Sequence, residues 1–497
     1  MKTLSRTVNV GVTTILSKAV QVIIPERNDK KVFLAICIGA IETVVLGFIF
    51  VYAKPTALQI CTVSLFAVFT FLTLRNIRWG LNFFLLFIPI HLLLLSALKS
   101  YLSSDELIMF SLLKDILLFI LFYCFVLGLL IKRIFVPASL ISVLMALFII
   151  VNLIFALHSP NLATSFYGAR LQLEFMVMYF LAAGLLKTSK HIRDAIFCFL
   201  AGGAIVATYA LTVLAGSTIA YGYEFGWLPY HIVGRLTVFG NVHTTNFFAT
   251  YLSTVALMLS GFVLFYKSCL SKKSYLLVFV LFMICIVGIV YSFSRRAWVA
   301  SFIAIMFISL LAKKLRFVVS MLLLLTVIVC AGYISSPKAT GILYDRLLSI
   351  SDPDSYYNIS RIDEWKGLLI RAKNRSFLGE GLGMVGSIGS KLSIADSTNT
   401  HNYYLATLIQ TGLVGLLSFG AIAIAALYLI IKAFLMARTP FLKAVTAGTA
   451  MAFISLLVQN MFGLTIEVYP FNLYYWFLIG LGVALFRASK DPSVKEQ

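Results

Sequence analysis

Charged residues are scarce in this chain of 497 residues, because aspartate, glutamate, lysine and arginine together make up only 12% of it. A soluble domain carries about a quarter, so the composition excludes an ordinary soluble protein. Hydrophobic residues make up 61%, and apolar runs of roughly 20 residues, long enough to cross a bilayer, recur from residue 32 onward. The short alternating strands of a membrane β-barrel are missing. The sequence therefore predicts an all-α integral membrane protein, a polytopic bundle of about 12–14 transmembrane helices.

Fourteen apolar stretches are the predicted spans. Only residues 294–296 separate the ninth from the tenth, which predicts a very tight hairpin there. The first 31 residues contain no cleavable apolar core, so the first span is expected to act as the targeting signal. The predicted spans are residues 32–52, 56–74, 79–98, 107–131, 134–157, 170–186, 194–215, 245–266, 274–293, 297–312, 317–335, 403–431, 444–463 and 471–486.

Lysines and arginines in the connecting segments predict the orientation. With the N-terminus inside, 25 of them lie on the cytoplasmic side and 14 outside, and eight of those 14 fall in one long loop. This predicts a multi-pass protein of the inner (cytoplasmic) membrane with both termini cytoplasmic. The net charge of +21 then mostly forms a cytoplasmic collar that faces anionic membrane lipid. The predicted parts are a cytoplasmic segment 1–31, transmembrane helices in 32–335, an extracytoplasmic loop domain 336–402, transmembrane helices in 403–486 and a cytoplasmic tail 487–497.

Several ligand and cofactor motifs are missing. None of the seven cysteines lies in an outer loop, so no disulfide framework is expected. No P-loop is present, and the GLGMVG at 381–386 follows no strand, which argues against a dinucleotide site. No cluster of histidine, cysteine or carboxylate residues has metal-site spacing. The sequence predicts a protein without a metal or cofactor, and without a folded basic domain for nucleic acid.

The long outer loop contains a predicted helix at 360–375, begun by the S-x-x-D capping signal of Ser360 and Asp363. Helical spacing places its apolar residues on one face. Such a helix is expected to lie on the outer membrane surface or to cover a site as a lid. The residues of this predicted face are Ile362, Trp365, Leu369 and, more loosely, Leu368.

Two charged features lie within predicted spans: Glu42 in the first, and the adjacent Lys114 and Asp115 in the fourth. Charges at membrane depth are costly and are usually paired or functional. Adjacent residues point about 100° apart on a helix, so we expect Lys114 and Asp115 not to neutralise one another simply. Snorkelling or a structural pairing is favoured over a role in the site.

Arginines gather at the predicted outer mouths of the helices. Outside the long loop, the outer segments hold six basic residues, of which four are arginines. Any one of them has an alternative role in snorkelling to lipid phosphate. As a set without lysine they indicate a phosphate or pyrophosphate ligand, because the planar guanidinium binds phosphate oxygens bidentately. The four are Arg170, Arg235, Arg295 and Arg296.

His401 is the candidate general base. It stands where a polar stretch turns into an apolar helix, and the chain has only six histidines. An imidazole with a pKa near 6.5 is suited to taking a proton from a hydroxyl at neutral pH. The alternative is an interfacial histidine that bonds a backbone carbonyl. His243, at the outer start of the eighth span, is the competing candidate.

The segment HNYYLATLIQTGLVG contains His401, Asn402, nine further residues, Gly412 and Gly415. It resembles the H-[NSQ]-x9-G-x-x-[GTY] pattern of O-antigen ligases, which recurs in the wider O-antigen ligase/polymerase superfamily. Three more segments resemble parts of that family and lie in family order across 235–415, although Phe377 stands where the family often has proline. They are GRLTVFGNVHTTNFFATYL with Arg235, SFSRRAWVASF with Arg295, and RIDEWKGLLIRAKNRSFLGEGLG with Arg361.

This resemblance implies a GT-C-like, metal-independent, inverting glycosyltransferase of bacterial surface polysaccharide synthesis. The family transfers a glycan from undecaprenyl diphosphate to a hydroxyl of an acceptor glycan or glycolipid at the outer leaflet, and a chain-length regulator or flippase is a possible partner. At the matching positions of this sequence, the resemblance implies that His401 is the general base. It implies that Arg235 and Arg295 hold the donor pyrophosphate, and that Arg361 seats the donor or closes a lid. Arg296 and Arg170 are additions from the charge pattern. Supporting residues are Asn402, His243, Asn241 and Asn246.

Three activities stay open within this resemblance: a repeat-unit polymerase, slightly favoured, a ligase that attaches the chain to lipid A-core, and a protein O-oligosaccharyltransferase. The last usually carries a C-terminal periplasmic extension, and this chain ends soon after its last span. A flippase or transporter of lipid-linked sugars is the alternative from another class. It predicts cationic residues to mid-membrane and two-fold sequence symmetry, and the sequence has neither.

Overall fold

The computed structural model describes residues 57–98, 103–159, 161–221, 245–335, 337–352, 356–374, 379–385 and 400–490. Every regular element in these ranges is a helix, and nine of the helices are long and apolar enough to cross a membrane. Two shorter apolar stretches, Thr62–Arg75 and Leu315–Ala331, accompany them. The prediction of an all-α polytopic membrane protein is confirmed. The first predicted span and Glu42 lie outside the described residues.

Internal contacts divide the chain into two compact units, Met1–Val136 with Gly184–Gly202, and Pro137–Ala183 with Gly203–Gln497. The first unit contains three packed helices and the beginning of a fourth. Its helices are α3 (Ala57–Arg75), α4 (Ile77–Leu98), α5 (Ser104–Leu130) and the first part of α9 (Ser189–Tyr221).

Within this unit, Lys114 and Asp115 correct one prediction. Lys114 Nζ lies 2.6 Å from Asp115 Oδ1, and both side chains are largely buried. The long lysine side chain folds back along α5 and reaches its neighbour despite the angle between them. Because a charge is expensive at membrane depth, this pairing lowers the cost of carrying both ions on α5.

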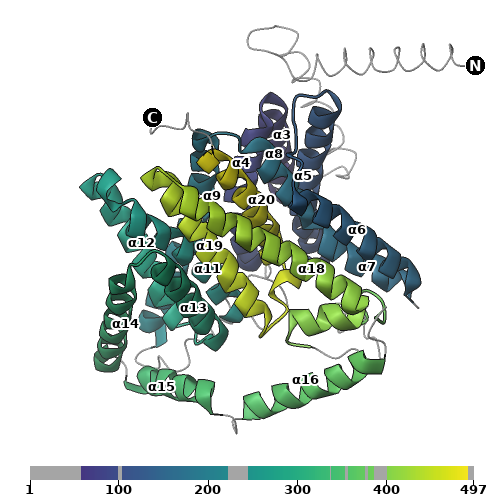
Figure 1. Cartoon of the computed structure of the whole chain (residues 1–497). Coiled ribbons are helices and arrows are strands. Elements are labelled where there is room, and N and C mark those ends of the chain that lie inside the picture. Colours follow the sequence, from purple (N-terminus) through teal and green to yellow (C-terminus); the bar gives the residue numbers. More distant parts are fainter. Residues whose placement is uncertain are drawn as a thin grey trace, which may run out of the picture. The chain divides into compact units, whose positions relative to one another are not determined.

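The second unit contains the rest of the helices (Figure 1). They are α6 (Leu140–His158), α7 (Leu162–Leu173), η1 (Glu174–Met176), α8 (Val177–Leu185), the rest of α9, α11 (Thr245–Phe265), α12 (Lys272–Val290), α13 (Arg295–Leu311), α14 (Leu315–Ser335), α15 (Pro337–Ser351), α16 (Tyr356–Asn374), α18 (Tyr403–Met436), α19 (Pro440–Asn460), η3 (Thr465–Glu467) and α20 (Phe471–Lys490). Helix α11 packs against α13 and α19, while α18 packs against α6, α19 and α20.

Small and polar residues hold α11, α13 and α19 together, as is typical of helices in a membrane. A Cβ atom at Gly261 would lie 2.2 Å from the Ala444 carbonyl oxygen, so only glycine permits this approach of α11 to α19. A chain of buried hydrogen bonds then joins the three helices. It runs from Thr250 through Gln459 and Ser455 to Ser253 and Ser301.

Two predicted elements differ from the structure. The predicted span 170–186 is instead α7, η1 and α8, and α7 begins at the capping residue Asn161, whose side chain accepts from the Thr164 amide at 3.1 Å. The predicted helix 360–375 begins four residues earlier as α16, so Ser360 lies inside it. Its buried face carries Leu368 and Ala372, and Trp365 is partly buried, whereas Ile362 and Leu369 are exposed. The predicted apolar face is therefore wrong for Ile362 and Leu369.

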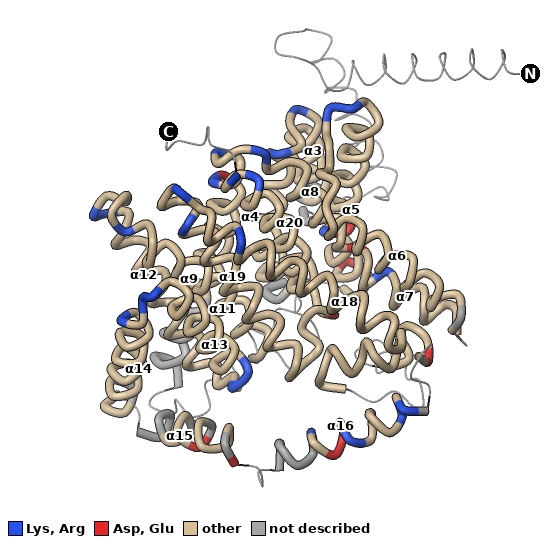
Figure 2. Tube along the Cα trace, viewed as in Figure 1, with Lys and Arg blue, Asp and Glu red and all other residues tan. Residues whose placement is uncertain are grey.

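Basic residues of the second unit gather where α12 and α14 begin, at the α18–α19 turn and at the end of α20 (Figure 2). In an antiparallel bundle these positions share one end. The distribution agrees with the predicted collar, and the cytoplasmic orientation stays a prediction.

Candidate active site

Helix α18 is broken near its start. Gly412 has φ 62° and ψ −167°, so a short helix, 403–411, precedes a longer one, 413–436. At 1.5 Å per residue the longer part measures about 36 Å and crosses a membrane by itself. The predicted continuous span 403–431 is therefore corrected, and the residues around His401 belong to a separate helix at the mouth of the bundle.

A glycine-rich segment, 379–385, pairs with this break. The Ile409 carbonyl accepts a hydrogen bond from the Glu380 amide at 2.7 Å, and the Gln410 carbonyl accepts one from the Gly381 amide at 3.0 Å. The Gln410 side chain also accepts from the Gly383 amide at 2.9 Å. Buried carbonyls need partners, and the break at Gly412 makes those of α18 available to this segment.

The glycines of this segment permit its close approach. A Cβ at Gly379 would lie 2.6 Å from the Gln410 carbonyl oxygen, and one at Gly381 would lie 2.5 Å from Ser159 Oγ. Gly379, Gly381 and Gly383 all have positive φ, which favours glycine. The G-x-G spacing is therefore a packing device that joins the loop to α18 and the end of α6. We call the segment 379–385 with residues 409–412 the glycine joint.

His401 immediately precedes the capping residue of α18. Asn402 is buried, and its Oδ1 accepts from the amides of Tyr404 and Leu405 at 3.0 and 3.2 Å. This fixes the helix start, and it gives Asn402 a structural role. His401 itself is half-buried and has φ 42°, a conformation uncommon outside glycine. The cap therefore holds the histidine in a defined position at the border of the bundle.

The adjacent arginines of α13 point to different neighbours. Arg295 Nη1 donates to the carbonyl and the hydroxyl of Ser349 on α15, at 2.8 and 3.1 Å. The Arg296 guanidinium lies 5.3 Å from the Phe247 ring centre and touches Gly463. Its Nε and Nη2 are buried and have no hydrogen-bond partner among the described residues.

Helix α16 brings a second guanidinium to Arg296. Arg361 and Trp365 lie one turn apart on the same face of α16. The Trp365 ring packs 6.4 Å from that of Phe462, next to Gly463, and its buried Nε1 has no partner among the described residues. Arg361 is close enough to repel the Arg296 charge. Burial lowers the pKa of the Arg361 guanidinium, while the nearby Glu364 carboxylate raises it.

The other end of α16 is tied to the glycine joint. Arg371 Nε donates to Glu380 Oε1 at 2.6 Å, and the second nitrogen pairs with the other carboxylate oxygen. Helix α16 thus runs from the neighbourhood of Arg296 to the joint that supports the start of α18. We call Arg296, Arg361 and Trp365 the arginine pocket. Two nitrogens of Arg296 and one of Trp365 are buried there without an acceptor among the described residues, as is expected of an anion site.

The remaining predicted residues have other positions. Asn246 Oδ1 accepts from Ser294 Oγ at 2.7 Å and so joins the starts of α11 and α13. Arg170 pairs with Glu174 at 3.2 Å on the exposed side of α7. Arg235, Asn241 and His243 lie outside the described residues. The described ranges contain no group of three residues that could hold a metal ion.

One carboxylate of this region, Glu467, was not predicted from the sequence. Glu467 in η3 is buried, with 7% of its surface exposed, and the Gln410 amide lies 3.4 Å from its Oε1. It also lies close to Tyr403. The signal was present, because Glu467 is the sole acidic residue between 397 and 490. Its position beside the glycine joint marks it as a structural support of the α18 start.

Residues 279–420 match the family described as O-Antigen ligase. This match supports the resemblance of the chain to the O-antigen ligase/polymerase superfamily. The matched range includes the arginine pair of α13, all of α16, the glycine joint and His401, whereas Arg170, Arg235 and Glu467 lie outside it. No curated protein matches the chain. The match supports an O-antigen ligase- or polymerase-type function in general, and that family implies lipid-linked glycan substrates in a membrane.

Replacing Gly379 by alanine is expected to open the glycine joint. The added Cβ would clash with the Gln410 carbonyl, and the positive φ costs about 1–3 kcal/mol for other residues. Thermal unfolding of the purified variant should show a clear loss of stability. The control is Gly367→Ala on α16, where no atom lies within 4 Å of the new Cβ. That variant should be neutral or more stable, and an equal loss in both would contradict the proposed packing.

Reversing the ion pair between α16 and the joint tests the coupling of the two. Arg371→Glu should destabilise the attachment of α16 by about 1–3 kcal/mol, because a charge-assisted pair is replaced by repulsion from Glu380. The exchange Arg371→Glu with Glu380→Arg should recover most of the loss. Limited proteolysis after residue 374 provides the readout. Equal cleavage of the single variant and the wild type would count against the coupling.

Proposed function

We propose that the protein transfers a glycan from undecaprenyl diphosphate to an acceptor sugar hydroxyl at the outer leaflet, as a repeat-unit polymerase of surface polysaccharide. The observation that carries the proposal is the arginine pocket, in which two nitrogens of Arg296 and one of Trp365 are buried without an acceptor among the described residues. Arg361 lies beside Arg296, and the pocket is at the same end of the bundle as His401. A diphosphate supplies the missing acceptors, and the apolar helices offer surface for the polyprenyl chain.

The chemistry follows from these positions. His401 takes the proton of the acceptor hydroxyl, and the resulting oxygen attacks the anomeric carbon of the donor sugar. The bond between that carbon and the phosphate oxygen breaks, so the configuration inverts and undecaprenyl diphosphate leaves. Arg296 and Arg361 neutralise the charge that develops on the leaving phosphate. Because the donor is already activated, the step needs neither ATP nor a metal ion.

The remaining predicted arginines have secondary parts in this proposal. Arg295, held by Ser349, fixes α15 against the start of α13 and lines the same mouth. Arg235 is proposed to contact the donor diphosphate, as the resemblance implies. Arg170 is proposed to contribute only lipid contacts, since its side chain pairs with Glu174.

A transfer assay with purified protein and a defined undecaprenyl-diphosphate glycan tests the mechanism. His401→Ala should lower the rate by about 10²–10⁴-fold, the range that a general base contributes. Arg296→Lys and Arg361→Lys should each lower it by at least about 10-fold, because lysine cannot bind phosphate bidentately. EDTA should have no effect. Lys366→Gln is the matched control, an exposed basic residue of α16 that should retain full activity.

The family description favours a ligase as the second candidate. Product length distinguishes the two activities in the same assay. A polymerase produces longer glycans that stay on the carrier lipid, whereas a ligase moves the chain unchanged to a lipid A-core acceptor. Deletion strains give the matching pattern, with single repeats on the cell surface after loss of a polymerase and long carrier-linked chains after loss of a ligase. Transport of the lipid without any transfer would overturn both.

A further inference from the structure

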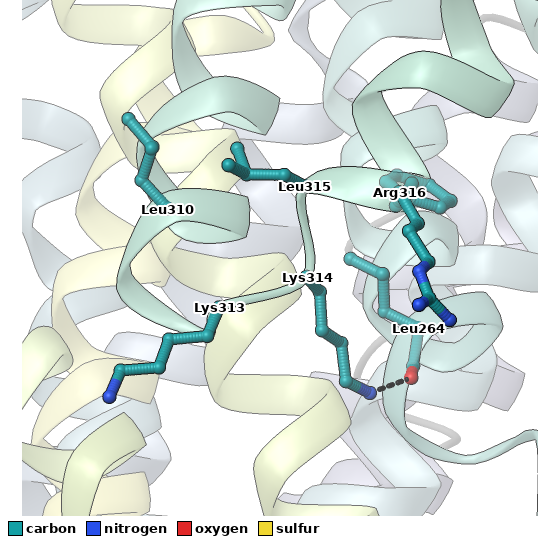
Figure 3. A pocket seen from close by; sticks show the side chains of 7 residues that line it. Leu264, Leu310, Lys313, Lys314, Leu315 and Arg316 are labelled. Atoms are coloured by element: carbon teal, nitrogen blue, oxygen red, sulfur yellow. Dashed lines mark hydrogen bonds between the residues drawn. The ribbon is translucent and has the colours of Figure 1, made fainter.

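A second charged site lies far from the arginine pocket. An open pocket of about 710 Å³ is formed at the turn between α13 and α14 (Figure 3). Helix α11 separates the two sites, because Asn246 at its start contacts Ser294, and Leu264 at its end contacts Lys314. Since α11 is a candidate membrane span, the pocket faces the leaflet opposite to the arginine pocket. Its lining residues are Lys313, Lys314, Arg316, Leu264, Leu310, Leu315 and Phe317.

Three basic residues line this pocket, and its lining contains no carboxylate. Lys314 Nζ donates to the Leu264 carbonyl at 2.6 Å and lies 4.1 Å from the Phe265 ring centre, with Lys313 and Arg316 on either side of it (Figure 3). Burial lowers the pKa of Lys314. Among the described residues no carboxylate forms an ion pair with these three. The group is a concentration of positive charge that an anion would relieve.

A fourth lysine strengthens this field. Lys443 Nζ donates to the Phe434 carbonyl at 2.7 Å, at the end of α18, as Lys314 does at the end of α11. The two ammonium groups are close enough to repel each other. Both are fixed by carbonyl groups and ring faces rather than extended into solvent, so their charges are held at the pocket.

The apolar part of the lining continues along the helices. Leu310 and Leu315 are about half exposed at the mouth of the pocket. Beyond them, α13 and α14 present further exposed apolar side chains, as surfaces in contact with acyl chains do. These are Phe307, Leu311, Val319 and Leu322. A ligand that matches both parts has an anionic head and an apolar tail.

We propose that this pocket binds the phosphate headgroup of an anionic phospholipid, with the acyl chains lying along α13 and α14. The apolar lining favours a lipid over a free phosphate, because a soluble anion would leave Leu310, Leu315 and their neighbours without contacts. A bound lipid would hold the end of α13 that lies opposite Arg296. The site does not depend on the proposed transfer reaction.

Lipid binding to the full chain in a neutral detergent tests this. Native mass spectrometry is used to titrate phosphatidylglycerol and phosphatidylcholine onto the wild type, onto Lys313→Gln with Arg316→Gln, and onto the control Lys272→Gln with Lys273→Gln. The control residues are exposed and basic, near the same end of the bundle but outside the pocket lining. Each basic residue near an anionic lipid contributes about a fivefold factor, so the pocket variant should bind phosphatidylglycerol about 25-fold more weakly.

The control should bind phosphatidylglycerol as the wild type does, and phosphatidylcholine should bind weakly to all three. The exchange Lys313→Arg with Arg316→Lys keeps the charges and should retain binding, which separates loss of charge from misfolding. Equal weakening in the control, or full binding by the pocket variant, would overturn the site. If millimolar glycerol phosphate displaced phosphatidylglycerol as effectively as the lipid itself does, the ligand would be a soluble phosphate and not a lipid.

Discussion

Two backbone hydrogen bonds join the loop segment 379–385 to the break in α18, those from the amides of Glu380 and Gly381 to the carbonyls of Ile409 and Gln410. They exist because Gly412 breaks α18 and because the loop glycines have no Cβ to obstruct the approach. In a membrane protein a broken helix is tolerated where protein groups satisfy its carbonyls. The loop therefore completes α18, and the capped helix start that carries His401 depends on it.

From this joint, α16 reaches across to α13 and places Arg361 beside Arg296. The Arg361 charge repels that of Arg296, and two nitrogens of Arg296 are buried without an acceptor among the described residues. In the proposed function a diphosphate supplies the missing acceptors, since charge-assisted bonds are strong at a partly desolvated site. The candidate catalytic groups lie where apolar helices end, a position that suits the proposed substrate with its apolar tail and polar head.

Apolar run length predicted most of the described helices, since a span must hold roughly 20 apolar residues whatever it packs against. It could not predict the breaks. The break at Gly412 and the division of α7 from α8 depend on contacts with residues distant in sequence. The motif indicated Arg295, yet the buried guanidinium nitrogens without an acceptor among the described residues belong to Arg296. Neighbouring residues point about 100° apart, and only the positions of Ser349, Phe247 and Gly463 decide which faces the pocket. Glu467 is the sole acidic residue between 397 and 490, but its place beside Gln410 and Tyr403 is evident only from the packing.

The central claim is that the arginine pocket holds the donor diphosphate while His401 serves the acceptor. Its most direct test is the affinity of purified protein for undecaprenyl diphosphate without a glycan, compared among wild type, Arg296→Gln, Arg361→Gln and His401→Ala. Each lost charge-assisted bond should weaken binding by about 10–100-fold, and His401→Ala should bind as the wild type does. Wild-type affinity in both arginine variants would contradict the account.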